Sequence, residues 1–359
     1  MKEIALLGGS RFIGVHLIQA LCQQGHKVTI FNRHLTLPPV PYPKGTRLVR
    51  GDRNNPESLR RLFDKKYDVV FDISGYTPKH VEPIALEYRS CIGHYIFCST
   101  TAVYKVPPPY PINENAPRIF DKNTYGGDKA LVENLLLNHY KENQWPITIF
   151  RLQNVFGPYK AAIVGFTFYR LINSLPLLIN NDFRANILFV DDLVTAFLSA
   201  MNNPISYGKI YGLAGDDIVS PLEFVELCGK ISAYSPILTF NSNSDLFKAY
   251  NDRFLFQLSY NRVFDCSKVK SELGMEFTPF GEAVNKTFLW VKENPSHLKR
   301  YALRGEKYVL NNLSIPMYAK GYWKGVDLLK WCRSKIARIK LLKNSYRLLV
   351  SRLRHSGRQ

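Results

Sequence analysis

The strongest constraint on the fold is a regular alternation of short strands and helices that begins at the third residue. Runs rich in β-branched and aromatic residues recur through the first 151 residues, with helix-like stretches between them. Because parallel neighbouring strands need a crossover, which a helix usually supplies, the pattern predicts an α/β fold with a doubly wound parallel sheet. The expected strands are 3–7, 27–31, 46–49, 68–73, 94–98 and 147–151, and the expected helices are 13–24, 56–64, 79–89 and 125–143.

A glycine-rich turn joins the first expected strand to the first expected helix. Residues 8–14 read Gly-Gly-Ser-Arg-Phe-Ile-Gly, and glycines here let a pyrophosphate approach the backbone N–H groups at the helix N-terminus. This placement predicts a dinucleotide-binding Rossmann sheet rather than a purely structural turn. The expected cofactor contacts in the turn are Gly8, Gly9, Ser10, Arg11, Phe12, Ile13 and Gly14.

The end of the second strand bears on the choice of dinucleotide. An NAD-binding chain usually places a carboxylate there to accept a hydrogen bond from the ribose 2′-hydroxyl, but this strand ends in Asn32 and Arg33. Arg33 and Arg11 can instead pair with a 2′-phosphate, unless both are simply solvated surface cations. We therefore expect NADP(H), with NAD(H) as the alternative. Asp52 and Ser74, which follow the third and fourth strands, complete the expected cofactor-binding set.

A Tyr-Gly-Gly-Asp-Lys segment opens the helix expected over 125–143. Its i, i+4 spacing puts the Tyr125 phenol and the Lys129 ammonium on one helix face. A nearby ammonium and the positive ring of an oxidised cofactor would lower the pKa of the phenol, so that Tyr125 could act as an acid or base at a carbinol or carbonyl oxygen. A hydroxyl-rich strand end at 98–104 precedes this segment and strengthens the prediction of a catalytic site.

Taken in order, these segments resemble the extended short-chain dehydrogenase/reductase superfamily, in particular the NAD(P)-dependent epimerases and dehydratases that act mainly on nucleotide sugars. The resemblance covers residues 1 to about 295 and implies a Rossmann domain with a smaller substrate lobe. It rests on the turn 8–14, the strand end 99–104, Tyr-Gly-Gly-Asp-Lys at 125–129, Arg-Leu-Gln-Asn-Val-Phe-Gly-Pro at 151–158, Phe-Val-Asp-Asp-Leu at 189–193, and Phe-Asp-Cys-Ser-Lys at 264–268 with Glu-Leu-Gly at 272–274.

The resemblance implies a role for each matching catalytic position. It implies that Thr100 hydrogen-bonds the reacting oxygen, that Tyr125 is the acid/base, and that Lys129 binds the nicotinamide ribose and tunes Tyr125. It also places Asn154 against the substrate phosphates. The expected substrate-binding residues are Thr100, Thr101, Asn154 and Arg184. No His and Cys residues stand at metal-ligand spacing in the sequence, so we expect no metal.

The chain departs from the family pattern in ways that narrow the reaction. Where the family's 4,6-dehydratases carry Asp-Glu after the strand-end threonine, this chain has Thr101 and Ala102. Neither dehydration nor decarboxylation, which also uses an acid there, is expected; hydride transfer by a 4-epimerase or a ketoreductase remains. The NADP-like strand end favours the reductase. Arg184 stands one residue early for the family's usual phosphate clamp, and Phe189 stands where the family usually has His. These departures weigh against a standard nucleotide sugar, so we expect either a nucleotide sugar or a related hydroxylated metabolite as the substrate.

The alternation loosens beyond residue 160, where segments 186–201 and 208–213 look like late additions to the same sheet. We expect an NAD(P)-binding domain over 1–160 with 186–215 returning to it, a discontinuous substrate lobe from 161–185 and 216–295, and a basic C-terminal extension over 296–359. The extension holds 16 Lys and Arg against two acids and thus carries most of the net charge of +19. The net charge therefore bears on where in the cell the protein binds more than on which substrate it converts.

Within the extension, apolar residues recur at spacings of three or four over 326–354, while Lys and Arg occupy mostly the other faces. This pattern predicts an amphipathic helix roughly 40 Å long. We expect it to lie on an anionic membrane surface, with packing on the protein's own body or on a second copy, and then nucleic acid, as less favoured alternatives. The family resemblance also implies a homodimer, for which the helix over 125–143 could serve.

An RNA-binding protein on the same scaffold is the alternative function. A few relatives with this form of the glycine turn resemble chloroplast RNA-binding proteins, and a net charge of +19 suits phosphate contacts. However, the charge lies in the extension, and an RNA-binding protein would not need Thr100, Tyr125 and Lys129 together. We therefore favour the enzyme, with nucleic acid as the less expected partner.

Three features bear on location. The six cysteines are scattered without a Cys-x-x-Cys pair, which is typical of reduced thiols. No apolar run approaches the roughly 18–20 residues needed to span a bilayer, and the first residues do not have the pattern of a signal peptide. We expect a cytoplasmic protein, held peripherally at the inner face of a membrane if the basic helix binds there.

Overall fold

The computed structural model describes residues 1–179, 183–240 and 260–301, all within one compact unit, Met1–Val309. Within these ranges seven parallel strands form the main sheet in the order β3-β2-β1-β4-β5-β6-β8. Their bounds are β1 Glu3–Leu7, β2 Lys27–Asn32, β3 Arg47–Arg50, β4 Val69–Asp72, β5 Tyr95–Thr100, β6 Ile147–Leu152 and β8 Lys209–Leu213. The expected doubly wound sheet is confirmed. Its strand order reverses between β1 and β4, where such folds bind ligands.

Alternate residues of the strands face two separate apolar cores. Ile4 and Leu6 belong to a core shared with α1, α6 and α9, whereas Ala5 and Leu7 belong to one shared with α2, α3 and α4. Because successive strand residues point to opposite faces, helices on both sides cover the central strands of the sheet, whereas the edge strand β3 is mostly exposed. These helices are α1 Ile13–Gln23, α2 Pro56–Leu62, α3 Pro78–Glu87, α4 Tyr125–Asn143, α6 Val190–Ala200 and α9 Ser267–Leu273.

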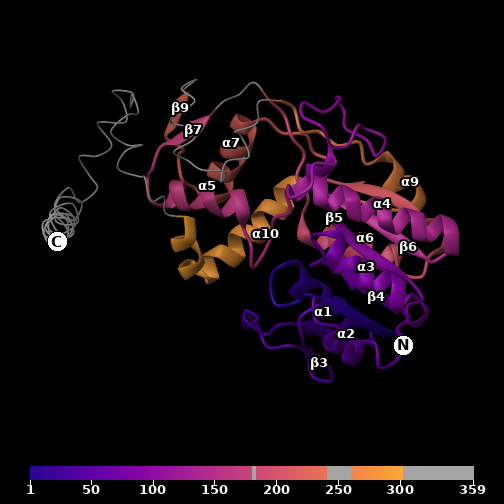
Figure 1. The fold of residues 1–359 in the computed structure, drawn as a ribbon. Helices are drawn as coiled ribbons and strands as arrows, with labels where there is room; N and C mark the ends of the chain where they lie inside the picture. The colour runs from indigo at the N-terminus through magenta and orange to yellow at the C-terminus, as the bar shows by residue number, and fades with distance from the viewer. Residues whose placement is uncertain (180–182, 241–259, 302–359) are drawn as a thin grey trace, which may run out of the picture. The chain divides into compact units, whose positions relative to one another are not determined.

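A second group of elements builds a smaller region. In it, β7 and β9 form a separate two-stranded parallel sheet, and α5, α7 and α10 contact one another (Figure 1). These elements are α5 Ala162–Ile172, β7 Leu177–Ile179, α7 Pro221–Ser232, β9 Leu238–Phe240 and α10 Phe280–Glu293. Short 3-10 helices are η1 Arg89–Cys91, η2 Thr101–Val103, η3 Pro204–Ser206 and η4 Pro295–Tyr301.

The sequence predictions for the elements are confirmed with one correction. The strand expected near 208–213 is β8, which adds to the sheet beside β6. Segment 186–201, in contrast, contributes no strand to the sheet; its residues 190–200 form α6. Apolar side chains there recur at helical spacing, and Asp191 and Asp192 in the first turn complement the helix dipole. The basic helix expected over 326–354 lies outside the described residues.

Candidate active site

The glycine turn after β1 opens onto a groove of about 610 Å³. Gly8 and Gly9 have φ angles of 121° and 98°, which residues with side chains rarely adopt. A Cβ atom on Gly14 would lie 2.3 Å from the Cα atom of Gly9, so α1 packs directly under the turn. The groove thus meets a helix N-terminus, where backbone N–H groups and the helix dipole favour an anion. This geometry fits a dinucleotide pyrophosphate.

All the expected cofactor-binding residues except Gly14 and Lys129 line this groove; those that do are Gly8, Gly9, Ser10, Arg11, Phe12, Ile13, Asn32, Arg33, Asp52 and Ser74. Gly14 and Lys129 are buried behind it. The sequence therefore located a continuous surface from the glycine turn to the ends of β2, β3 and β4, although it could not show which side chains remain free to contact a ligand.

Gly14→Ala is expected to weaken dinucleotide binding by about tenfold or more, equivalent to about 1.4 kcal/mol. The added methyl group must push the turn away from α1, because it would meet the backbone of Gly9. Titration calorimetry with NAD(H) and NADP(H) measures the effect. Gly281→Ala is the control, since a Cβ atom there would lie 3.9 Å from its nearest neighbour. Equal affinities in the two variants would contradict this account of the turn.

The end of β2 uses its asparagine to hold the turn. The Asn32 side-chain amide donates to the carbonyl oxygen of Gly8 at 3.1 Å and accepts from the backbone N–H of His34 at 2.8 Å. Arg33 is exposed beside it, while Arg11 donates to the Thr36 hydroxyl at 3.0 Å. Of these two cations, Arg33 is the one that has no recorded partner within the described ranges, and it remains available for a ligand phosphate.

An arginine that sequence reasoning missed lies in the same groove. Arg53 is 9% exposed, and its guanidinium donates to both carboxylate oxygens of Asp72, at 3.0 and 2.8 Å, and to the Ser74 hydroxyl at 3.1 Å. Burial opposes ionisation of Asp72, but the Arg53 guanidinium outweighs it and keeps the pKa of this carboxyl below its usual value. The signal in the sequence was an acid that ends the otherwise apolar strand β4.

The three expected catalytic residues come from two adjoining elements. Thr100 ends β5, and Tyr125 and Lys129 lie on the first turns of α4. A Cβ atom on Gly126 would lie 2.0 Å from the carbonyl oxygen of Ala102. The paired glycines after Tyr125 therefore let the start of α4 pack directly against the backbone that follows β5. This close packing explains why the Tyr-Gly-Gly-Asp-Lys segment contains glycines inside a helix.

Tyr125 lines a second cavity, of about 330 Å³, although 55% of the residue is exposed. Desolvation raises the pKa of the phenol, and a hydrogen bond with Thr100 opposes this shift without cancelling it. Lys129 is not among the groups that act on the pKa of Tyr125 in the protein alone, so the lowered pKa expected from Lys129 together with an oxidised cofactor stays a prediction. The Lys129 ammonium is buried and donates to the carbonyl oxygen of Cys98 at 2.5 Å, and burial lowers the pKa of Lys129.

Three of the four expected substrate residues, Thr100, Thr101 and Asn154, line the second cavity. Asn154 has a φ of 29°, a strained conformation that clusters at functional sites in proteins. Arg184 is not part of the lining; its guanidinium lies 3.3 Å from the Glu223 carboxylate on a half-exposed surface. Its role in substrate binding stays a prediction.

The arginine in the cavity lining is Arg262, which sequence reasoning also missed. Its backbone N–H donates to the carbonyl oxygen of Arg184 at 2.8 Å, so the two arginines lie on neighbouring chain segments. The Arg262 guanidinium donates to the Tyr260 hydroxyl at 2.7 and 3.2 Å. Lys105 is the other cation in the lining, and none of the described residues that line the cavity is Asp or Glu.

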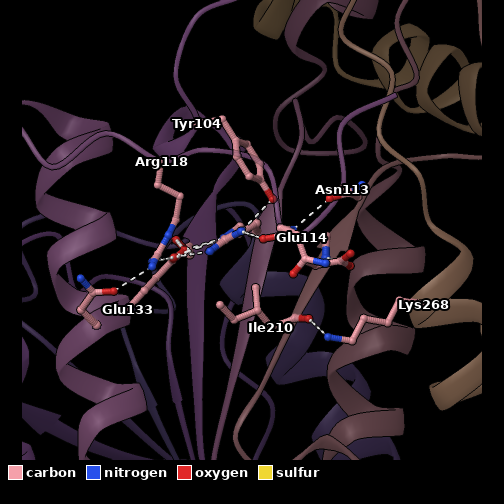
Figure 2. A network of polar contacts seen from close by, with 12 residues as sticks. Tyr104, Asn113, Glu114, Arg118, Glu133, Ile210 and Lys268 are labelled. Atoms are coloured by element: carbon pink, nitrogen blue, oxygen red, sulfur yellow. Dashed lines mark hydrogen bonds and ion pairs between the residues drawn. The ribbon is translucent and has the colours of Figure 1, made fainter. Parts of the chain in front are cut away.

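A buried ionic network lies behind this cavity, and Figure 2 shows Glu133, Arg118 and Tyr104 of this network. Glu133 of α4 is fully buried and accepts from Arg151 of β6 at 2.7 Å, from Arg118 at 2.9 Å and from the Ser99 hydroxyl at 2.6 Å. Arg151 also donates to the Tyr104 hydroxyl at 2.8 Å. This Glu133 network joins α4, β5 and β6 to the segment that carries Tyr104 in the cavity wall.

The described part of the chain offers neither a metal site nor a membrane-spanning helix. No cluster of His, Cys, Asp and Glu residues there could hold a metal ion. No helix within those residues is long and apolar enough to cross a membrane.

Comparison with known proteins gives a consistent result. The model of the NAD dependent epimerase/dehydratase family matches residues 4–214. The chloroplast stem-loop binding protein of 41 kDa b from Arabidopsis thaliana is 30% identical over 65% of this chain and 64% of its own length. A UDP-glucose 4-epimerase from Neisseria meningitidis serogroup B is 27% identical over 46% of this chain and 56% of its own. The chain thus spans less than two thirds of either relative.

Among solved structures, UDP-glucose 4-epimerase from Thermotoga maritima, determined with UDP-glucose, superposes with a TM-score of 0.68. The alignment covers 81% of this chain and 99% of the other at 18% identity, which supports the fold alone.

Proposed function

Because the chain belongs to the NAD-dependent epimerase/dehydratase family, we propose that it is an NAD(P)-dependent epimerase or ketoreductase that acts on a nucleotide sugar or a related hydroxylated metabolite. The observation that carries the proposal is the Thr100–Tyr125 pair, which lines a cavity whose described lining residues include no Asp or Glu, with the Lys129 ammonium buried behind it. This arrangement suits proton transfer at a single carbon–oxygen bond.

In the proposed reaction the dinucleotide supplies the hydride acceptor or donor. Tyr125 takes the proton from the substrate hydroxyl during oxidation and returns it during reduction, while Thr100 hydrogen-bonds the same oxygen. Together with the positive ring of an oxidised dinucleotide, the Lys129 ammonium would favour the phenolate. The partly exposed phenol leaves room for substrate, whereas the buried ammonium is shielded from water and so acts more strongly on its neighbours.

The cavity favours epimerisation or net reduction over dehydration. Dehydration needs a base that removes a proton beside the ketone, and the positions that follow Thr100 are Thr101 and Ala102. Among the described residues that line the cavity, there is no Asp or Glu that could replace such a base. Arg262 and Lys105 together favour an anionic substrate, such as the diphosphate of a nucleotide sugar.

For the cofactor we propose NADP(H), with NAD(H) as the alternative. The end of β2 offers no carboxylate to a ribose 2′-hydroxyl, because Asn32 stands there and is engaged by the turn. Exposed Arg33 is suited to a 2′-phosphate. The family description names NAD, so the experiment includes both dinucleotides.

We expect denaturation of the protein to release about one dinucleotide per chain. Mass spectrometry of the released molecule then distinguishes NAD from NADP. Tightly held NAD together with interconversion of UDP-glucose and UDP-galactose supports the epimerase. NADPH that exchanges freely, and that is oxidised when a 4-keto nucleotide sugar is added, supports the reductase. If the protein binds neither dinucleotide in direct titration, the proposed chemistry is wrong.

A second candidate function is RNA binding on the same scaffold, favoured by the 30% identical relative that is named as a stem-loop binding protein. Affinity for a stem-loop RNA that falls steeply with salt, and that survives loss of Tyr125, would support it. Absence of such binding at low salt would remove it.

The cellular setting is also a proposal. We propose a cytoplasmic protein that binds an anionic membrane surface through 326–354, a segment outside the described residues, and that forms a homodimer in which α4 takes part. Co-sedimentation with anionic vesicles tests the first part, and sedimentation equilibrium tests the second.

A further inference from the structure

The loop between β4 and α3 is fixed from both of its ends. Asp72 accepts hydrogen bonds from the backbone N–H groups of Ser74 and Gly75, at 3.0 and 2.8 Å. The next residue, Tyr76, donates its backbone N–H to the His80 Nδ1 atom at 3.1 Å. Because Arg53 donates to both Asp72 and the carbonyl oxygen of His80, one buried ion pair holds the whole loop. The position of Tyr76 is therefore set by the fold.

The Tyr76 ring lies beside the catalytic residues. Its centroid is 6.3 Å from that of Tyr125, and the Lys129 Nζ atom lies 5.2 Å from the Tyr76 centroid and 4.5 Å from the Phe97 centroid. The Tyr76 residue is 49% exposed and lines the cofactor groove. It thus separates the groove from an ammonium that is only 2% exposed.

Lys129 is unusual in having so few polar partners. An ammonium carries three N–H donors, yet among the described residues the recorded acceptor is the carbonyl oxygen of Cys98 alone. A buried ammonium with one acceptor is costly in its charged form. Two aromatic faces lie within 6 Å of the Lys129 Nζ atom, and they stabilise the charged form because the negative face of a ring attracts a cation most strongly when both are desolvated.

We propose that Tyr76 is a positioning residue that keeps the Lys129 ammonium charged and in place beside Tyr125 through its aromatic face. The inference rests on the proposed function only for its effect on turnover. Its effect on Lys129 follows from the geometry of the loop and can be measured separately.

The other groups that act on Lys129 do not replace the ring. Burial has the largest effect on the pKa of Lys129 and lowers it. Cys98 of β5, Asp72 of β4 and Glu133 of α4 favour the charged ammonium. Arg53 opposes the charged form. Asp72 is already paired with Arg53, and Glu133 with Arg118 and Arg151. Loss of the Tyr76 ring therefore removes a contribution that no neighbouring charge is free to supply.

The test compares Tyr76→Leu with Tyr76→Phe in the full-length protein. Carbon-13 NMR of ε-labelled lysines, with Lys129→Met to identify the signal, gives the pKa of Lys129 directly. Leucine still covers the ammonium but offers it no ring face, so Tyr76→Leu lowers this pKa, with a proton affinity about threefold to tenfold weaker. Tyr76→Phe retains the ring face and keeps the wild-type value.

Turnover provides the second measurement. Because Lys129 then loses its charge at lower pH, the alkaline limb of the pH profile of kcat shifts to lower pH in Tyr76→Leu and not in Tyr76→Phe. Equal Lys129 titrations in the two variants, with both folded by circular dichroism, would overturn the proposal. A shifted Lys129 titration in a protein without sugar turnover would instead leave the proposal standing and reject the proposed function.

Discussion

Tyr125→Phe is expected to reduce turnover of the nucleotide sugar by about 10²–10⁴-fold while leaving dinucleotide affinity unchanged. The substitution removes the hydroxyl that exchanges a proton with the substrate, and general acid–base groups contribute rate factors of this size. The ring remains, so the cavity wall and the start of α4 keep their shape. Single-turnover kinetics, which follow hydride transfer by the absorbance of the reduced cofactor, isolate the chemical step from product release.

Tyr234→Phe is the matched control, because Tyr234 is also partly exposed but follows α7 and lines neither the groove nor the cavity. The control is expected to retain full activity. The pH profile gives a further check: desolvation raises the pKa of Tyr125, so the phenolate needed for oxidation forms at higher pH than for a free tyrosine. Full turnover in Tyr125→Phe would show that another group moves the proton.

The sequence predicted the parts of this site that depend on local order in the chain. Gly8 and Gly9 follow a strand directly, and Tyr125 and Lys129 lie four residues apart on one helix, so short-range geometry places them. The alternation of strands and helices then brings both segments to the carboxyl ends of the sheet, as the groove and the cavity confirm.

The residues that sequence reasoning missed depend on contacts between distant segments. Arg262 reaches the cavity because its backbone is hydrogen-bonded to that of Arg184. No local sequence pattern predicts this pairing between two distant segments. Arg53 is a surface residue by type, and only its pairing with Asp72 explains its burial. The prediction that segment 186–201 adds to the sheet is wrong, because a short apolar run is compatible with a strand as well as with a buried helix. The 3.6-residue period of its apolar side chains indicates the helix.

The Glu133 network provides the largest expected effect on stability. Glu133→Ala leaves Arg151, which is 1% exposed, and Arg118 without their shared carboxylate. Removing one partner of a buried ion pair typically costs about 3–5 kcal/mol, because the remaining charge stays buried without compensation. Since domains are stable by only about 5–15 kcal/mol, we expect a large fall in the urea midpoint of unfolding, with cavity shape affected through Tyr104 (Figure 2).

The control for this loss is Glu142→Ala, at the exposed end of the same helix. This substitution also removes a carboxylate, but it leaves no buried cation without a partner. We expect it to change the free energy of unfolding by less than about 0.5 kcal/mol. A double variant, Glu133→Leu with Arg151→Met, should recover part of the loss, because replacing a buried pair by apolar residues removes the uncompensated charge. Arg118 is partly exposed and can turn toward water, which limits its share of the cost. A midpoint for Glu133→Ala equal to that of Glu142→Ala would mean that the network orients Tyr104 without stabilising the fold.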